Sequence, residues 1–179
     1  MATPVLAFTQ LANECEAEGL AHKNAEKIGA ELAKTFQVQP DEVAVLKVDK
    51  LTLQFAYPTK LGHIGTIPIN ASSSVAGRTA TTKRAEIINN FAQTKHASVF
   101  ESVDLGQKPK GGIPGEKVDK HTHVIQKLMS APVVTPAGVV GVIQISRKGT
   151  SAPAAGADFT PADLQKLVTI ATSLGKVFK

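Results

Sequence analysis

The sequence predicts an α+β fold with a mainly antiparallel sheet of five or six strands and the helices of both chain ends on one face. Pairs of short apolar runs joined by tight turns are typical of hairpins. Helical periodicity is confined to the two ends of the 179-residue chain and to one short segment between them. That short helix and a long loop over 90–123 are expected to cover the other face.

The N-terminal region, residues 1–37, reads as one amphipathic helix or a helix pair. Gly19 divides it, and its second half has apolar residues at helical spacing: Ala21, Ala25, Ile28, Leu32 and Phe36. Pro40 ends the helix. Residues 42–48 and 51–57 then alternate as two strands of a hairpin.

A short helix is predicted over 75–80, after serines that can cap it, and a short strand over 85–89. The stretch from Asn90 to Thr122 is rich in glycine and proline and is too long for a plain connection. Because long loops in compact domains are usually functional or disordered, this segment is interpreted as a lid.

A second hairpin is predicted around the turn Thr135-Pro136-Ala137-Gly138. Both faces of the strand that follows the turn are apolar, so that strand should lie inside the sheet with both sides covered. Gly141 within it indicates a bulge or the close approach of another group. Pro132 cannot donate to a sheet ladder, so its strand should be bulged or paired on one side there.

The last predicted helix covers 160–178. Thr160 is a good N-cap, Pro161 fits the first helical position, and Asp163 can close a capping box. The helix then has an apolar seam, which could face a second copy as readily as its own core. As a dimer interface the seam comprises Leu164, Leu167, Ala171, Leu174 and Phe178.

The composition favours a single soluble, cytoplasmic domain. Lys and Arg total 20 against 15 Asp and Glu, but these charges are spread out and aromatic residues make up 4%, so nucleic-acid binding is not favoured. Neither a membrane helix, which needs about 20 apolar residues, nor a signal peptide is expected. The single cysteine, Cys15, allows no internal disulfide and no multi-cysteine metal site.

Three segments of the chain, in order, match one family. Residues 74–80 (Ser-Val-Ala-Gly-Arg-Thr-Ala) look like its small helix, and residues 127–133 look like its strand that ends in Val-Pro-Leu. Residues 140–145 and 159–164 look like its last strand and terminal helix. Together they resemble the GAF domain, a small-molecule-sensing module of signalling proteins. The resemblance spans nearly the whole chain and implies a ligand pocket between the sheet and the layer of loop and short helix.

The resemblance also allows specialised branches of the family to be compared. Members that bind cyclic nucleotides often have Asn-Lys, then Phe, then Asp-Glu. Here Arg147 stands in the Asn place and Leu164 in the Glu place, while three positions match: Lys148, Phe159 and Asp163. This partial match weakens the case for a cyclic nucleotide.

Two other branches depend on cysteine. Bilin-binding members usually attach pigment through a cysteine, but Cys15 lies in the first helix, far from the expected pocket. Members that reduce free methionine sulfoxide need several cysteines, because one thiol attacks and another resolves. With one cysteine, and no nucleophile–base pair or paired carboxylates, the sequence favours no catalytic residues and no enzyme.

The resemblance implies ligand-binding residues around the pocket: Asn89, His96, Phe100, Glu101, His121, His123 and Met129. A turn role for Asn89 is the alternative. His121 and His123 would share a face of a strand and could hold a metal ion with a third ligand, but solvated loop histidines are favoured and no metal site is predicted. Lysines of the loop could attract an anionic ligand or simply be solvated. No cofactor is assigned.

Two functions follow from these observations. The first is a regulatory sensor that binds a small molecule between the sheet and the 90–122 loop and signals through its terminal helices, as a homodimer. The alternative is a ligand-free module for dimerisation or partner docking, indicated by the apolar seam of the last helix. Any output domain would lie on another polypeptide, or the protein would work alone.

Overall fold

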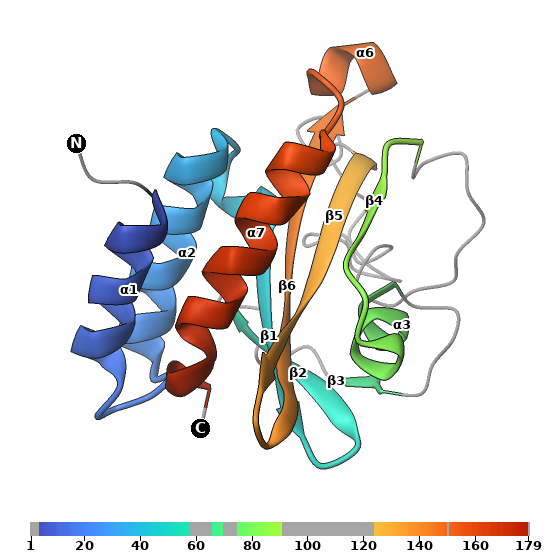
Figure 1. The fold of residues 1–179 in the computed structure, drawn as a ribbon. Helices are drawn as coiled ribbons and strands as arrows, with labels where there is room; N and C mark the ends of the chain where they lie inside the picture. Colours follow the sequence, from blue (N-terminus) through green and yellow to red (C-terminus); the bar gives the residue numbers. More distant parts are fainter. Residues whose placement is uncertain (1–3, 58–65, 70–74, 91–123, 150, 179) are drawn as a thin grey trace, which may run out of the picture.

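The computed structural model describes residues 4–57, 66–69, 75–90, 124–149 and 151–178. Its centre is a six-stranded sheet in the order β3-β2-β1-β6-β5-β4, in which every neighbouring pair is antiparallel (Figure 1). The strands are β1 (Val43–Asp49), β2 (Thr52–Tyr57), β3 (Thr66–Pro68), β4 (Glu86–Ile88), β5 (Val124–Thr135) and β6 (Gly138–Gly149). Residues 91–123, nearly all of the predicted loop, lie outside the described residues.

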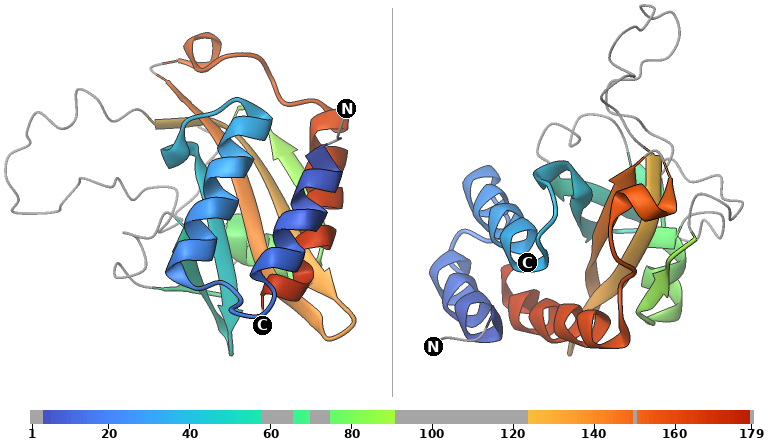
Figure 2. Two further views of the ribbon diagram at one scale, coloured as in Figure 1. Left: turned by 90° about the vertical axis from the view of Figure 1, so that its left-hand side faces the viewer. Right: turned by 90° about the horizontal axis from the view of Figure 1, so that it is seen from above.

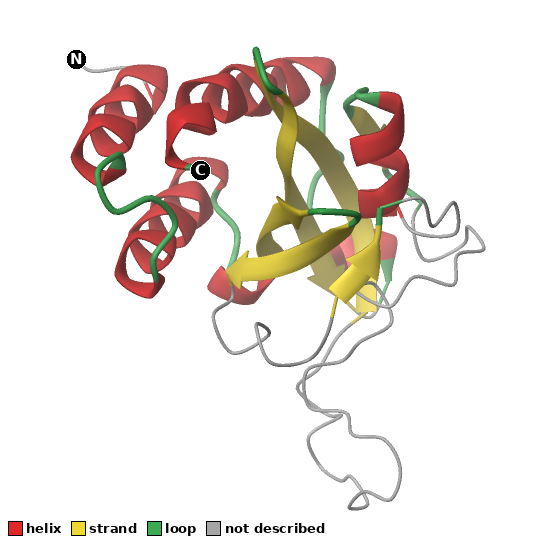
Figure 3. Ribbon diagram, turned by 90° about the horizontal axis from the view of Figure 1, so that it is seen from below, coloured by secondary structure: helices red, strands yellow, loops and turns green. Residues whose placement is uncertain are grey.

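Helices cover both faces of this sheet. The longer helices α1 (Pro4–Cys15), α2 (His22–Phe36) and α7 (Pro161–Leu174) lie on one side, and α3 (Val75–Thr82) lies on the other (Figures 2 and 3). We call these sides the helix face and the α3 face. The expected fold class is confirmed. The remaining helical turns are η1 (Pro40–Glu42), α6 (Ala152–Ala155) and η5 (Gly175–Val177).

The start of α7 follows from local sequence. The Asp163 backbone N–H donates to Thr160 Oγ1 at 3.1 Å, and the Thr160 N–H donates to Asp163 Oδ2 at 2.9 Å. Pro161 occupies the first turn, where a missing N–H costs no hydrogen bond. The predicted capping box is therefore present.

The β5–β6 hairpin confirms both predictions made from its special residues. Pro132 pairs with Val142 of β6, and it lies beyond the three residues of β5 that pair with β4. Gly141 marks a close approach. A methyl group added there would lie 2.4 Å from a ring carbon of Phe178 and 2.6 Å from the Leu46 carbonyl oxygen.

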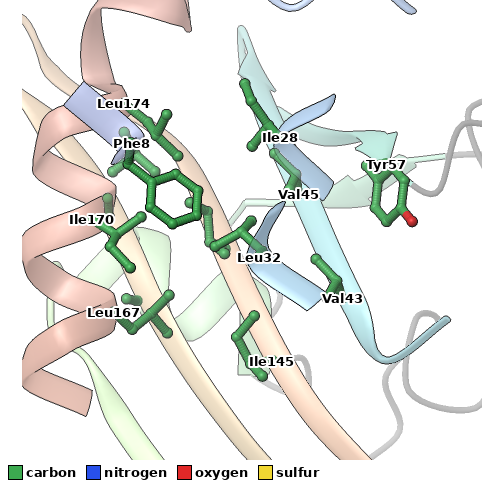
Figure 4. Packing of buried hydrophobic residues seen from close by; sticks show 14 of the residues in the cluster. Phe8, Ile28, Leu32, Val43, Val45, Tyr57, Ile145, Leu167, Ile170 and Leu174 are labelled. Carbon is green, nitrogen blue, oxygen red and sulfur yellow. The ribbon is translucent and has the colours of Figure 1, made fainter. Parts of the chain in front are cut away.

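The helix face is packed by one continuous apolar cluster, drawn in Figure 4. Side chains of α7 point into it together with Phe8 of α1 and Leu32 of α2. The predicted dimer seam belongs to this cluster. Leu167, Ala171 and Leu174 are fully buried in the chain itself, as is nearly all of Phe178, and Leu164 packs against them.

The structure therefore places the seam in the chain's own core, and a dimer through this seam stays a prediction. Periodicity indicated an apolar stripe, but it could not say which surface the stripe meets. In the structure the helix that carries the stripe packs against strand β5 and helix α1. No helix within the described ranges has both the length and the apolar character needed to cross a membrane.

Candidate functional site

One row of residues crosses the α3 face from β1 to β4. Gln144 of β6 pairs with Ala44 of β1 on one side and with Ser130 of β5 on the other, and Ser130 in turn pairs with Glu86 of β4. Strand alternation points these side chains to the same side. The middle of a sheet face is normally apolar, so two polar residues side by side there are unusual.

Helix α3 completes a buried polar cluster over this row. Thr79 Oγ1 lies 2.7 Å from Ser130 Oγ, and Gln144 Nε2 donates to the same Ser130 oxygen at 3.1 Å. Thr79 and Ser130 have no exposed surface, and Gln144 is 1% exposed. We call Thr79, Ser130 and Gln144 the polar cluster. It is uncharged, and its hydroxyl groups satisfy each other.

The cluster leaves one atom unsatisfied. Gln144 Oε1 is buried and accepts no hydrogen bond within the described ranges. Among the described residues, only one other buried side-chain nitrogen or oxygen atom, the donor Arg147 Nε, lacks a hydrogen-bond partner. A buried acceptor without a donor costs about 1–3 kcal/mol. The arrangement therefore offers a hydrogen-bond acceptor in the middle of the α3 face.

An ion pair closes the row at its outer edge. Arg78 Nε and Nη2 donate to the two carboxylate oxygens of Glu86, each at 3.0 Å. The two side chains are 40% and 31% exposed, so the pair contributes at most about 1 kcal/mol. Its geometric effect is to fix α3 against β4, which places Thr79 over Ser130.

Apolar residues flank the polar cluster on both sides. Toward β1 and β2 lies a cluster in which α3 meets the sheet: Ala44, Leu46, Leu53, Phe55, Ala76, Ala80 and Val142. Toward β4 lies a smaller cluster of Val75, Ile125 and Leu128, with Ile88 against it. An apolar surface with a few placed polar groups is typical of small-molecule sites.

The structure turns the side chains of two predicted ligand residues away from the α3 face. Met129 is fully buried in the helix-face core, whereas its neighbours Leu128 and Ser130 point to the α3 face. Asn89 is also turned away, because its amide bonds the backbone of Phe159 in both directions, at 2.9 and 3.1 Å. The family resemblance indicated the region of the pocket, but the alternation along the strand decides to which face each side chain points.

The other predicted ligand residues, namely His96, Phe100, Glu101, His121 and His123, lie outside the described residues. The sequence reasoning missed the polar cluster, although a signal was available. Ser130 and Gln144 are polar residues, and each stands between two apolar residues of its strand. Such an interruption indicates either a buried hydrogen-bond network or a binding site.

The residues that matched the cyclic-nucleotide motif lie around the connection from β6 to α7. Arg147 stacks on the Phe159 ring, with its guanidinium carbon 4.6 Å from the ring centroid. Asp163 caps α7, and the Lys148 backbone N–H donates to Glu42 Oε2 at 2.6 Å. At least Phe159 and Asp163 therefore have structural roles.

Cys15 ends α1 and is 1% exposed within the helix-face core. Burial raises the pKa of its thiol, and the nearby Lys27 lowers it by a smaller amount. A buried thiol with a raised pKa is a poor nucleophile. In the described ranges, no group of three or more His, Cys, Asp or Glu side chains is placed to hold a metal ion.

No protein-family model matches the chain, and no curated protein matches it in sequence. Solved structures do match its fold. The GAF domain of an Acinetobacter phosphoenolpyruvate-protein phosphotransferase is 14% identical, with a TM-score of 0.63 and coverage of 99% of this chain and 94% of that one. Its counterpart from Coxiella burnetii is 10% identical, with a TM-score of 0.63 and coverage of 96% and 90%.

A GAF-fold enzyme is similar as well. The free methionine-R-sulfoxide reductase of Neisseria meningitidis, solved with its substrate, is 15% identical, with a TM-score of 0.58 and coverage of 99% of this chain and 92% of that one. The fold thus occurs both in a GAF domain of a phosphotransferase and in a free methionine-R-sulfoxide reductase. Together with the antiparallel sheet and its two helical layers, these likenesses show that this chain has the GAF fold.

Proposed function

We propose that this chain is a regulatory domain that binds a small molecule against the α3 face, at the polar cluster. The observation that carries the proposal is the buried, unpaired Oε1 of Gln144. A ligand that donates a hydrogen bond there would satisfy it. The GAF fold supports the proposal, because domains of this fold are generally small-molecule-sensing modules.

The surroundings of Gln144 define the ligand further. The polar cluster is uncharged, and the charges of Arg78 and Glu86 already neutralise each other. The flanks on both sides are apolar. We therefore propose a ligand with an apolar body and an N–H or O–H donor, recognised by a hydrogen bond rather than by charge.

A catalytic role is not proposed. The methionine sulfoxide reductase has the same fold, but this chain has a single cysteine, and that residue is buried on the helix face. Thiol exchange needs a second thiol to resolve the first bond. The polar cluster has hydroxyl groups but no imidazole, carboxylate or amine to activate them.

The experiment compares two glutamine variants. Gln144→Met keeps the length of the side chain and removes the unpaired oxygen, and Gln54→Met is the control at an exposed position of β2. Gln144→Met removes the unsatisfied oxygen but also the Nε2 donor to Ser130, whose hydroxyl keeps Thr79 as a partner. The gain and the loss should therefore largely cancel and change the unfolding free energy by about 1 kcal/mol or less. The folded variant then reports on binding alone.

A metabolite library is screened by thermal shift on the native chain, and native mass spectrometry reports the mass of the bound compound. A stabilising compound should raise the melting temperature of the Gln54→Met control as it does that of the native chain. The same compound should not raise the melting temperature of Gln144→Met. A compound that stabilises Gln144→Met equally well, or a library without any stabilising compound, would overturn the proposal.

A further inference from the structure

A second arrangement of polar groups lies on the helix face, where the chain leaves β6 and enters α7. Lys127 of β5 and Arg147 of β6 are direct cross-strand partners. Asn89 follows Ile88, the residue of β4 that pairs with Leu128, so it lies beside Lys127 at the edge of the sheet. Figure 1 shows α6 above these strands and the connection that descends from it to α7.

These three side chains hold four successive residues of the connection. Lys127 Nζ donates to the Gly156 carbonyl oxygen and lies 2.8 Å from Asp158 Oδ1. Arg147 Nη1 donates to the Ala157 carbonyl oxygen at 2.9 Å. Asn89 binds the N–H and the carbonyl of the next residue, Phe159. The segment in front of α7 is therefore fixed by side chains rather than by a strand ladder.

The charges of this arrangement do not balance. Lys127 and Arg147 place two positive charges directly opposite each other, which is unfavourable across a strand pair. Asp158 supplies the one carboxylate that forms an ion pair with either cation in the described part of the chain. The Lys127 side chain is 5% exposed, whereas that of Asp158 is 68% exposed. A buried cation is thus paired with a carboxylate that water reaches freely.

One hydrogen-bond donor of the two cations also lacks an acceptor. Arg147 Nε is buried and, within the described ranges, donates to no acceptor. Arg147 does stack on the Phe159 ring, which positions its guanidinium group beside the connection. A buried charged donor without a partner is costly, so an acceptor at this position would be stabilising.

We propose that Lys127 and Arg147 form a binding site for a small oxyanion, and that Asp158 of the chain itself occupies the Lys127 side of this site in the structure. A phosphate or a free carboxylate has the oxygen acceptors that Lys127 Nζ and Arg147 Nε require. The exposed carboxylate of Asp158 is the partner that an incoming oxyanion would displace. Because Asp158 lies two residues before the N-cap Thr160, exchange would loosen the segment that leads into α7.

The test removes the charge of Asp158, the residue that occupies the site in the structure. Asp158→Asn keeps the shape of an exposed side chain and deletes its charge, and Asp49→Asn makes the same charge change at an exposed strand end. Isothermal titration measures sodium phosphate and sodium acetate on each protein, with ionic strength held constant by sodium chloride. Phosphate and acetate distinguish a phosphate ligand from a carboxylate ligand.

Asp158→Asn should bind one of these oxyanions about fivefold more tightly than the native chain, because the oxyanion no longer has to displace the Asp158 carboxylate. Water reaches that carboxylate, so displacing it should cost less than about a tenfold factor in affinity. Asp49→Asn should match the native chain. The tighter binding should vanish in the double variant that combines Asp158→Asn with Lys127→Gln. Equal binding by both single variants would show a general effect of net charge. If Asp158→Asn bound neither anion, the contacts of Lys127 and Arg147 would have a structural role only. Either result would overturn the proposal.

Discussion

The two faces of the sheet are built from the same strands and differ in what covers them. On the helix face, α1, α2 and α7 contribute Phe8, Leu32 and Leu167 to one continuous apolar cluster. On the α3 face, two smaller apolar clusters are separated by the polar cluster around Ser130 and Gln144. Neighbouring residues of one strand therefore meet unlike surroundings.

This difference separates the region that stabilises the fold from the proposed binding site. A continuous apolar cluster stabilises the fold and leaves no group unsatisfied. A buried amide oxygen without a donor does the opposite, because it costs free energy until something binds it. We therefore expect substitutions in the apolar cluster of the helix face to alter stability and those at Gln144 to alter binding.

The largest effect is expected in the helix-face core. Leu167→Ala removes a side chain with no exposed surface, and the cavity it leaves should lower the unfolding free energy by about 3 kcal/mol, measured by urea denaturation. Leu51→Ala, at a position 76% exposed, is the control and should change it by less than about 0.5 kcal/mol. If Leu167→Ala instead lowered the unfolding free energy only slightly, and by an amount that depends on protein concentration, the seam would lie between two copies of the chain.

A smaller loss is expected on the α3 face. Ser130→Ala removes the hydroxyl that Thr79 and Gln144 share, so the unfolding free energy should fall by about 1–2 kcal/mol. Adding Gln144→Met should recover part of the loss, because the amide that lost its partner is then gone. Strictly additive losses in the double variant would show that the polar cluster is not one network. Ser173→Ala, on a partly exposed position of α7, is the control.

The cap of α7 should contribute less than either cluster. Thr160→Ala removes the acceptor for the Asp163 N–H, and we expect a loss of about 1 kcal/mol in thermal or urea unfolding. Thr172→Ala, at an exposed position of the same helix, should not destabilise the chain, since alanine has the higher helix propensity. Equal losses for both variants would contradict a role of the capping box.

The smallest effect concerns pH. Burial raises the pKa of Cys15, so the folded chain keeps its thiol protonated at a pH where the unfolded chain begins to release the proton. This contribution to stability is complete below the unfolded pKa, near pH 9, and is lost as the pH rises toward the folded pKa. Urea unfolding at about pH 8 and about pH 10, under reducing conditions, should therefore show a steeper loss for the native chain than for Cys15→Ala. Equal losses of unfolding free energy in the native chain and in Cys15→Ala would contradict the raised pKa.

Much of the fold was predictable because its signals are local. The capping box of Thr160 and Asp163 depends on residues three apart, and the hairpin turns depend on four successive residues. Strand alternation also predicted which residues share a face. The candidate site was less predictable, since its three members come from α3, β5 and β6 and meet only through strand pairing.

The sequence by itself therefore determined the elements, their order and the apolar stripes, because these depend on side-chain periodicity and on local hydrogen bonds. The tertiary structure decided which way each stripe faces. It turned the α7 seam into the chain's own core and placed Met129 and Ser130 on opposite faces. It also aligned Gln144 with Ser130. Register and packing partners arise from contacts between residues far apart in the chain, and no local pattern specifies them.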